Sequence, residues 1–495
     1  MAELKHIEQV IVADVTSSLV TQNAVGSINI PSSPPISVSF PYLMVLCAFI
    51  CALSFTDRMI HKNSPIVIVT REFKTFQNSY VNVYLCALGT EWLQDSHLLA
   101  LLLRRGYSVD KVAYLFIVSF VVTFACEQFG FRVFGRNAGF LGGSRNACLL
   151  CFGLYVLSGF TIFHDEYHSL LLGRIFYGIA TALLHTTFDA WMSSEHMKNA
   201  FPDEWLMQTY QNVGRKTVIV AVGSGVVAEV CASYAGLAAP FLASMGCSLM
   251  GMITVSNSWP KNVHDKPCSY ESLAECSDDG IMGTLFTALT SFLTALSELM
   301  SSSSGRTALH VVIVQAFFET SMYVTMFMWT PTLNASTIEY MGIGVPPPYG
   351  IIFSILMAAL MLGSHIFQVA FSSMEPETVC FRMCCVAACA ILVLALCGTS
   401  AHWVLITALI LFQFCVGIYY PVIGHLRGHH IPFEQRSAAG DLSKTILAIL
   451  VVLILLNFAS MASFVFLCCA FMLGGSVVSL YAADFQIDDD DDDSC

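Results

Sequence analysis

The sequence predicts an all-α protein that crosses a lipid bilayer many times. Of its 495 residues, 56% are hydrophobic and 12% are charged, whereas soluble domains carry roughly 25% charged residues. The mean hydropathy of +0.69 agrees with this prediction. Too few polar side chains are present to cover a surface in contact with water, so lipid is the expected partner for most of it. The apolar runs are long and unbroken, unlike the short apolar–polar alternation of barrel strands.

Thirteen segments are apolar enough to serve as spans, since a transmembrane helix needs about 20 such residues. They lie near residues 41–57, 78–103, 110–130, 146–163, 168–194, 210–234, 237–257, 307–331, 347–372, 378–398, 402–426, 438–458 and 460–482. The first, over 41–57, stands apart behind a polar stretch, so we predict an accessory transmembrane helix there. The other twelve form two groups of six, 76–257 and 307–483, around a central segment, 258–306. Two six-helix halves are typical of a duplicated transporter architecture.

The distribution of lysine and arginine predicts which ends of the helices face the cytoplasm. An alternating topology puts most basic connections on one side, which we take as cytoplasmic, while Arg104, Arg105 and Lys111 are exceptions on the other. The N-terminal tail over 1–40, predicted to be disordered, then lies outside. So does the loop that holds the sequon Asn334-Ala335-Ser336, which makes Asn334 a glycosylation candidate.

Two further segments are assigned to the cytoplasmic side. The acidic tail over 484–495 contains six consecutive aspartates, 488–493, which predict a solvated, disordered segment. In the central loop, apolar residues over 281–299 recur at helical spacing, which predicts an amphipathic helix. That helix has two open roles, a packing strut between the halves or a lipid sensor.

Charge and cysteine usage narrow the classes of function. The net charge is −13 and no basic patch is present, so no nucleic-acid partner is expected. The 19 cysteines lie mostly inside apolar segments, and no spacing matches a zinc site, so we predict no metal and no cofactor. No span-end cluster of nucleophile, base and oxyanion donors is present, which argues against an enzyme. A monomer is expected.

Charged residues interrupt the apolar run over 168–194. On a helix, Arg174, Gly178, Thr181, His185 and Asp189 fall within roughly 80° of one another and form a polar stripe. A charged side chain at the centre of a bilayer costs at least about 2.5–3.5 kcal/mol. The first and last of these five residues are about 22 Å apart at the helical rise, too far to pair with each other. Each therefore needs a partner on another helix or a wet passage.

Similar polar islands occur in other spans. Glu91, Gln94 and Asp95 share one face of the span over 78–103, and Glu319 lies one turn after Gln315 in the eighth span. Any one island is explained by a structural hydrogen bond between helices. Together, acids and one deep arginine are what an anion or proton-coupled pathway needs.

Two weak matches hint at an internal repeat. Arg174-Ile-Phe-Tyr-Gly178 compares with Gln413-Phe-Cys-Val-Gly417, each in the fourth span of its group of six. Glu91 and Glu319 each lie midway along the first span of their group.

At these residues the chain resembles the major facilitator superfamily. LLLGRIFYGIATA is similar to that superfamily's fourth-helix motif, in which an arginine precedes a glycine by four residues. A tighter resemblance is to the molybdate-anion transporter branch, over roughly residues 41–440. It is carried by Glu91-Trp92-Leu93-Gln94, Phe188-Asp189-Ala190-Trp191, Gln315-Ala316-Phe317-Phe318-Glu319, Trp329-Thr330-Pro331 and the stretch from Cys415 to Pro421. The accessory N-terminal span also fits that branch.

The resemblance implies a major-facilitator-type 6+6 helix bundle and secondary active transport of a small oxyanion, molybdate, by alternating access. Arg174 would then offset anion charge, and Gln94, Tyr177 and Gln315 would offer hydrogen bonds to the substrate. Four further side chains would line the passage or serve coupling, with a proton as the candidate ion. They are Glu91, Glu319, Asp189 and His185.

The chain departs from the superfamily pattern in one loop. The gating loop between the second and third core helices retains Gly135-Arg136 but lacks the preceding aspartate. Two alternatives therefore stay open beside oxyanion transport. One is a transporter of the same fold for a small organic solute, a sugar or carboxylate; the other is a non-transporting membrane scaffold or sensor.

Overall fold

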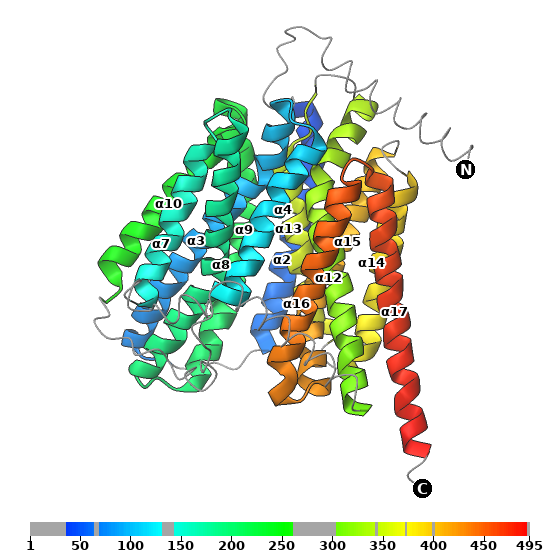
Figure 1. The fold of residues 1–495 in the computed structure, drawn as a ribbon. Coiled ribbons are helices and arrows are strands. Elements are labelled where there is room, and N and C mark those ends of the chain that lie inside the picture. The colour runs from blue at the N-terminus through cyan, green and yellow to red at the C-terminus, as the bar shows by residue number, and fades with distance from the viewer. Residues whose placement is uncertain are drawn as a thin grey trace, which may run out of the picture.

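The computed structural model describes residues 36–63, 69–130, 143–260, 303–341, 345–371, 374–397 and 401–492. These residues contain helices and no strand, which confirms the all-α class (Figure 1). The thirteen long helices are α2 (Ile36–Asn63), α3 (Arg71–Arg104), α4 (Val109–Ala125), α7 (Ser144–Thr161), α8 (Tyr167–Lys198), α9 (Asp203–Ala235), α10 (Ala239–Ser258), α12 (Ser303–Met341), α13 (Tyr349–Ile366), α14 (Pro376–Cys397), α15 (His402–His430), α16 (Arg436–Phe458) and α17 (Ala462–Asp492). Three short turns of other helix types are η1 (Cys126–Gly130), η3 (Phe367–Phe371) and η4 (Phe433–Gln435).

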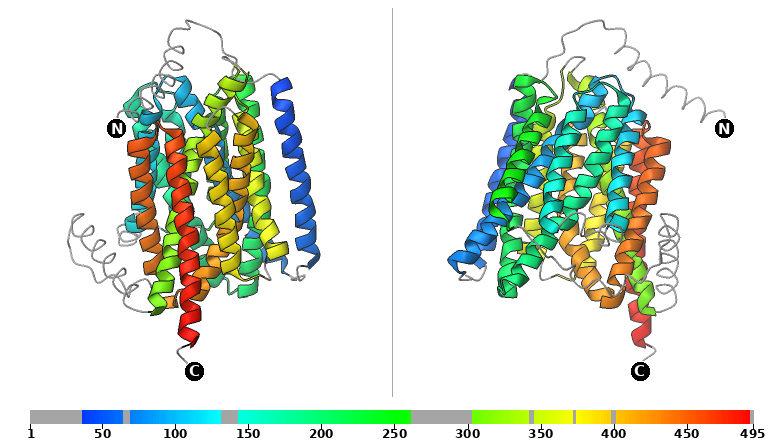
Figure 2. Two further views of the ribbon diagram at one scale, coloured as in Figure 1. Left: turned by 90° about the vertical axis from the view of Figure 1, so that its right-hand side faces the viewer. Right: turned by 60° about the vertical axis from the view of Figure 1, so that its left-hand side comes forward.

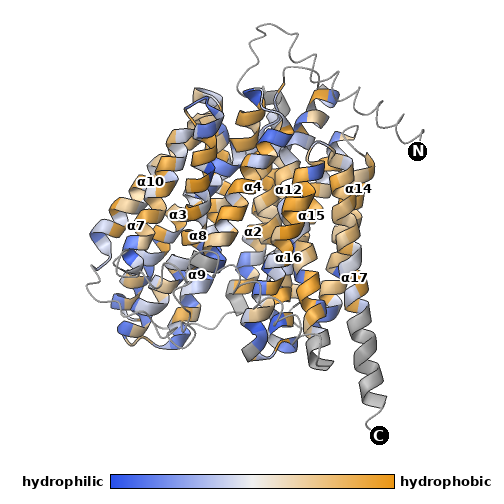
Figure 3. Cartoon of the chain, in the orientation of Figure 1, coloured by the Kyte–Doolittle hydropathy of each residue, from blue (hydrophilic) through white to orange (hydrophobic). Residues whose placement is uncertain are grey.

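The surface of the bundle matches a lipid environment. Eleven helices of the described chain are long and apolar enough to cross a membrane. Hydrophobic residues cover the middle of the bundle, and hydrophilic residues gather at its two ends (Figure 3). α3 and α7 are not among the eleven; polar residues such as Glu91 and Asp95 in α3 and Arg145 in α7 lower their hydropathy.

The twelve helices after α2 pack in two groups. In the N-terminal group, α3 to α10, helix α8 packs against α4 and α7, and α3 packs against α9 and α10. In the C-terminal group, α12 to α17, helix α15 packs against α13 and α14, and α12 packs against α16 and α17. The two groups meet mainly where α9 packs against α13 and α4 against α16 (Figures 1 and 2).

Two glycines hold equivalent places in these groups. A Cβ atom added to Gly178 on α8 would lie 2.6 Å from the carbonyl oxygen of Ser119 on α4. One added to Gly417 on α15 would overlap the carbonyl oxygen of Leu360 on α13. In both groups the fourth helix therefore approaches the backbone of the second helix at a glycine. These are the two glycines that the weak internal match pairs.

Helix α2 lies against α13 of the C-terminal group, at the edge of the bundle (Figure 2). At one end the Tyr42 hydroxyl is 2.6 Å from Nε2 of His402 on α15, and at the other the Thr56 hydroxyl is 3.2 Å from Nδ1 of His365. Its remaining surface exposes large apolar side chains such as Met44 and Phe55. The helix begins at Ile36, within the stretch predicted as a tail.

Two loop predictions were wrong. Helix α12 continues to Met341, so Asn334 lies in a helix and not in an exposed loop. Its carboxamide oxygen accepts a hydrogen bond from Tyr349 (3.3 Å), and the sequon serine, Ser336, is fully buried, an arrangement that does not suit glycosylation. The difference lies at Pro331, because proline usually ends a helix but here lies inside α12. Likewise α17 is helical to Asp492, through most of the run predicted as disordered.

Residues 1–35 of the predicted N-terminal tail lie outside the described residues, and two other predicted segments do as well. Gly135 and Arg136 of the gating loop lie outside the described residues, and so does the amphipathic segment over 281–299.

Candidate functional site

Arg174 is buried inside the N-terminal group, with 3% of its surface exposed. Its Nη2 donates to the hydroxyl of Ser158 on α7 at 3.5 Å, and its Cζ lies 4.6 Å from the centre of the Tyr177 ring. Among the described residues, no carboxylate oxygen lies within 4.0 Å of its guanidinium nitrogens. The side chain thus points into the bundle, where a hydroxyl and an aromatic face contact the cation.

Tyr177 links this cation to a carboxylate on α3. Its hydroxyl donates to Oδ1 of Asp95 at 2.8 Å. The face of the Tyr177 ring therefore contacts the Arg174 guanidinium, while its hydroxyl contacts the Asp95 carboxylate. The predicted site residues do not include Asp95, which shares a helix face with Glu91. Its position one turn after that acid was the signal that could have identified it.

Glu91 lies one helical turn before Asp95 on α3 and is buried against α7 and α8. Its Oε1 accepts hydrogen bonds from Thr181 at 3.2 Å and Tyr155 at 3.5 Å, and these two hydroxyls lie 3.2 Å apart. No lysine or arginine nitrogen of the described chain lies within 4.0 Å of its carboxylate. Glu91 and Arg174 are therefore two separate buried ionisable groups in one layer of hydroxyl-bearing side chains.

Gln94 does not join this group. It is fully buried, and its Nε2 donates to Ser244 on α10 at 2.9 Å, while Ser244 donates to the carbonyl oxygen of Thr90. The side chain therefore ties α3 to α10 and does not face Arg174. On a helix, Gln94 and Asp95 lie on opposite sides of Glu91, and in the structure it is Asp95 that contacts α8, through Tyr177.

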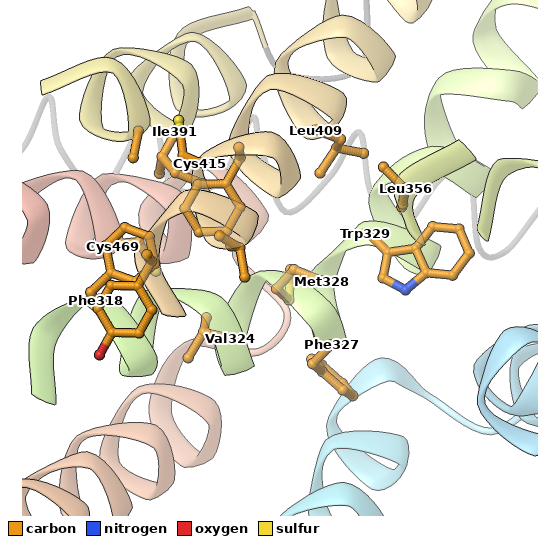
Figure 4. Close-up of a cluster of buried hydrophobic side chains, with 14 of the residues drawn as sticks. Phe318, Val324, Phe327, Met328, Trp329, Leu356, Ile391, Leu409, Cys415 and Cys469 are labelled. Atoms are coloured by element: carbon orange, nitrogen blue, oxygen red, sulfur yellow. The ribbon is translucent and has the colours of Figure 1, made fainter. Parts of the chain in front are cut away.

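The C-terminal group contains a similar carboxylate. Oε1 of Glu319 on α12 accepts from the hydroxyl of Tyr419 on α15 at 3.0 Å and from Nε2 of Gln315 at 3.1 Å. The Tyr419 ring stacks on Phe318 with ring centres 4.2 Å apart, and Phe318 belongs to the apolar cluster in Figure 4. In both groups, then, a glutamate on the first helix accepts a hydrogen bond from a hydroxyl on the fourth.

The other two predicted residues of α8, His185 and Asp189, are exposed. Nδ1 of His185 lies 2.8 Å from Oε1 of Glu127 in η1, and Nζ of Lys444 on α16 lies 3.3 Å from Oε2 of the same carboxylate. Asp189 accepts from the hydroxyl of Tyr80 on α3 at 2.9 Å. The predicted stripe thus changes from buried to exposed along α8, and its exposed part reaches a contact between the two groups.

A second polar contact joins the groups where α3 and α9 end and α13 begins. Oε2 of Glu229 on α9 accepts from the backbone N–H of Gly350 at 2.7 Å and lies 3.6 Å from Nε2 of His97. A Cβ on Gly350 would overlap the carbonyl oxygen of Gly225, so the helix backbones touch. A carboxylate is also favourable at a helix N-terminus. Neither Glu127 nor Glu229 was singled out in the sequence, since the partner of each is far away along the chain.

A family described as 12-TM sugar transporters matches residues 41–419. The chain belongs to this family, MFS_5, of the major facilitator superfamily. It is an integral multi-pass membrane protein of a transporter family and not an enzyme. The resemblance drawn from the fourth-helix motif is thereby confirmed.

Relatives and solved structures agree with the family. The molybdate-anion transporter of Danio rerio is 28% identical over 410 residues, covering 80% of this chain and 82% of that one. The molybdate-anion transporter of Xenopus tropicalis is 25% identical, covering 74% and 75%. The nucleoside transporter NupG (TM-score 0.59, 10% identity, 83% of this chain and 98% of that one) and the POT family transporter PepTSo (0.62, 10%, 83% and 97%) share the fold.

Proposed function

We propose that this MFS_5 protein is a secondary active transporter that carries an oxyanion, molybdate, between its two helix groups. The observation that carries the proposal is Arg174, a buried guanidinium with no carboxylate of the described chain within 4.0 Å. A buried cation that no carboxylate contacts directly is strongly unfavourable unless another group offsets its charge, and Asp95 reaches Arg174 only through Tyr177. A bound oxyanion supplies that charge together with acceptors for the guanidinium hydrogens. The names of the relatives support molybdate as that anion.

The carboxylates are assigned to coupling and not to contact with the anion. Glu91 and Glu319 each sit at the first helix of a group and each accept hydroxyl hydrogen bonds. An ionised carboxylate would repel an oxyanion, whereas a protonated one would not, so proton uptake and anion binding favour each other. A proton is therefore the proposed coupling ion. Gln315, bonded to Glu319, belongs to this coupling set, and Tyr177 positions the guanidinium.

Alternating access requires that the two contacts between the groups open in turn. The Glu229 contact joins α9 to α13, and the Glu127–Lys444 contact joins η1, which follows α4 directly, to α16. His185 contacts the same Glu127 carboxylate as Lys444. Gain or loss of a proton by His185 would therefore strengthen or weaken the Glu127–Lys444 contact. Asp189, exposed one turn further along α8, would line the passage on the same side.

Tracer uptake tests the role of Arg174. Cells that lack their own molybdate carrier would express the wild type, Arg174→Leu and Arg145→Gln. Arg145 is also a buried arginine of the N-terminal group, but it donates to a backbone carbonyl, that of Ser256 at 3.2 Å, and controls for the loss of a buried cation as such. We expect Arg174→Leu to reach the membrane and to lose molybdate uptake, and Arg145→Gln to retain it. Normal uptake by Arg174→Leu would remove the residue from the mechanism.

A small organic solute is the second candidate, because the family description names sugars. Aromatic side chains near the proposed passage would suit such a solute. Of these, Trp191 is buried and stacked on Trp259 with ring centres 3.5 Å apart, whereas Tyr420 is half exposed. A competition assay separates the candidates, since tungstate and sulfate should displace an oxyanion and sugars or carboxylates an organic solute. Flux of either kind in proteoliposomes would rule out a scaffold without transport activity.

A further inference from the structure

Two adjacent histidines and a glutamate meet where α14 begins and α15 ends. His430 is the last residue of α15, and its Nε2 lies 2.6 Å from Oε1 of Glu377 in the first turn of α14. His429 precedes it, and the ligand atoms of the three residues all lie within 4.8 Å of one another. The trio lies wholly in the C-terminal group, and the transport mechanism proposed above does not use it.

We propose that Glu377, His429 and His430 bind a divalent transition-metal ion, with Zn²⁺ as the expected ion. Imidazole nitrogen and carboxylate oxygen are both Zn²⁺ ligands, and two histidines with one glutamate form a donor set that leaves a fourth position open to water. Mg²⁺ and Ca²⁺ prefer sites built from oxygen atoms alone, so two imidazoles disfavour them. A helix-end ion pair would explain only His430 and Glu377, whereas a metal also engages His429.

The geometry needs only small movements to close around an ion. With bonds of about 2.0–2.2 Å, the ligand atoms of a tetrahedral Zn²⁺ site lie about 3.3 Å apart. The three ligand atoms are already within 4.8 Å, and the 2.6 Å contact between His430 and Glu377 would open slightly to admit the ion. His429 is exposed and Glu377 is partly exposed, so an ion in the surrounding solvent can reach both side chains.

Arg436 fixes the backbone that carries the two histidines. Its Nη2 donates to the carbonyl oxygen of Gly428 at 2.7 Å and its Nε to that of Ile431 at 3.0 Å. These carbonyls flank the histidine pair on both sides, so the turn is held without using the imidazoles. The guanidinium charge is directed to carbonyls at the C-terminal end of α15, where the helix dipole itself favours a cation.

Direct titration tests the site. Purified full-length protein in detergent would be stripped of metal and titrated with Zn²⁺ against a chromophoric chelator. We expect one tight Zn²⁺ per chain, weakened at least about tenfold in His429→Gln and in Glu377→Gln. His425→Gln is the matched control, because His425 is an exposed histidine one turn earlier on α15 that is not part of the trio. It should bind as the wild type does.

Two spectroscopic and thermal measurements make the result decisive. Nineteen cysteines offer competing ligands, so Co²⁺ would be used as a probe, and its spectrum should lack a thiolate-to-metal charge-transfer band. Bound Zn²⁺ should raise the unfolding temperature of the wild type and of His425→Gln, but not of His429→Gln. Absence of tight Zn²⁺ binding, equal binding by wild type and both ligand variants, or a thiolate band would overturn the proposal.

Discussion

The Glu127 carboxylate contacts two basic side chains from different helix groups. His185 on α8 belongs to its own N-terminal group, whereas Lys444 on α16 belongs to the C-terminal group and lies 3.3 Å away. Because the lysine is nearly half exposed, the pair contributes little to global stability. The Glu127–Lys444 pair connects the two helix groups, which must separate there if access alternates. Its loss should therefore change the transport rate more than the unfolding temperature.

We therefore expect Lys444→Gln to leave the unfolding temperature within a few degrees of wild type while changing the rate of substrate uptake. The charge swap Glu127→Lys with Lys444→Glu should restore part of the wild-type rate. Lys198→Gln is the control, since the Lys198–Glu195 pair of 2.9 Å lies within one helix. Equal uptake by Lys444→Gln and wild type would show that the contact does not govern the transition.

The paired glycines give a prediction about stability. A Cβ at Gly417 would overlap the Leu360 carbonyl oxygen, and backbone cannot move aside as a flexible side chain can. Gly417→Ala should therefore destabilise the protein by about 1–3 kcal/mol, the usual effect of overpacking. Gly424→Ala, on the same helix with open space around its Cβ, should be neutral or stabilising by about 0.5–1 kcal/mol. Thermal unfolding in detergent measures both, and equal melting temperatures would contradict the close approach.

The helices could be predicted because the length of an apolar run reports directly on a span. Each predicted span coincides with a helix in the structure. The prediction failed at Pro331, because a proline that usually ends a helix can be tolerated inside a long buried one. The start of α2 was placed late for a similar reason, since Pro41 lies inside that helix.

The sequence predicted which residue types are buried at the site, but it did not predict which of them contact one another. That Arg174 would turn inward followed from the cost of exposing it to lipid. The neighbour that Arg174 contacts could not be predicted in this way, because rotating a helix about its axis does not change its hydropathy. In the structure Asp95, and not the predicted Gln94, contacts the Tyr177 side chain that lies against the guanidinium. Contacts such as Glu127 with Lys444 depend on how the two groups dock, and no local pattern encodes that.

Glu229 allows a test of the contact between α9 and α13. Glu229→Ala would leave the Gly350 N–H buried without its acceptor, at a cost of about 1–3 kcal/mol. Glu229→Gln keeps an acceptor oxygen and should lose clearly less. Ser233→Ala, one turn along α9, serves as control, because within the described chain its hydroxyl donates to the Glu229 carbonyl oxygen of its own helix. Unfolding temperatures are compared, and equal losses in the alanine and glutamine variants would refute the hydrogen bond as the cause.

Glu319 separates binding from coupling. Glutamine at this position can still accept the Tyr419 hydrogen bond of 3.0 Å, but it cannot release a proton. If the carboxylate couples transport, Glu319→Gln should lose uptake driven by a proton gradient and keep exchange of substrate across proteoliposomes without a gradient. Tyr419→Phe is the matched variant, because it removes the hydrogen-bond donor and leaves the proton in place, so it should stay gradient-driven. The coupling role depends on this difference between the two variants, since a merely structural Glu319 would make exchange and gradient-driven uptake fall together.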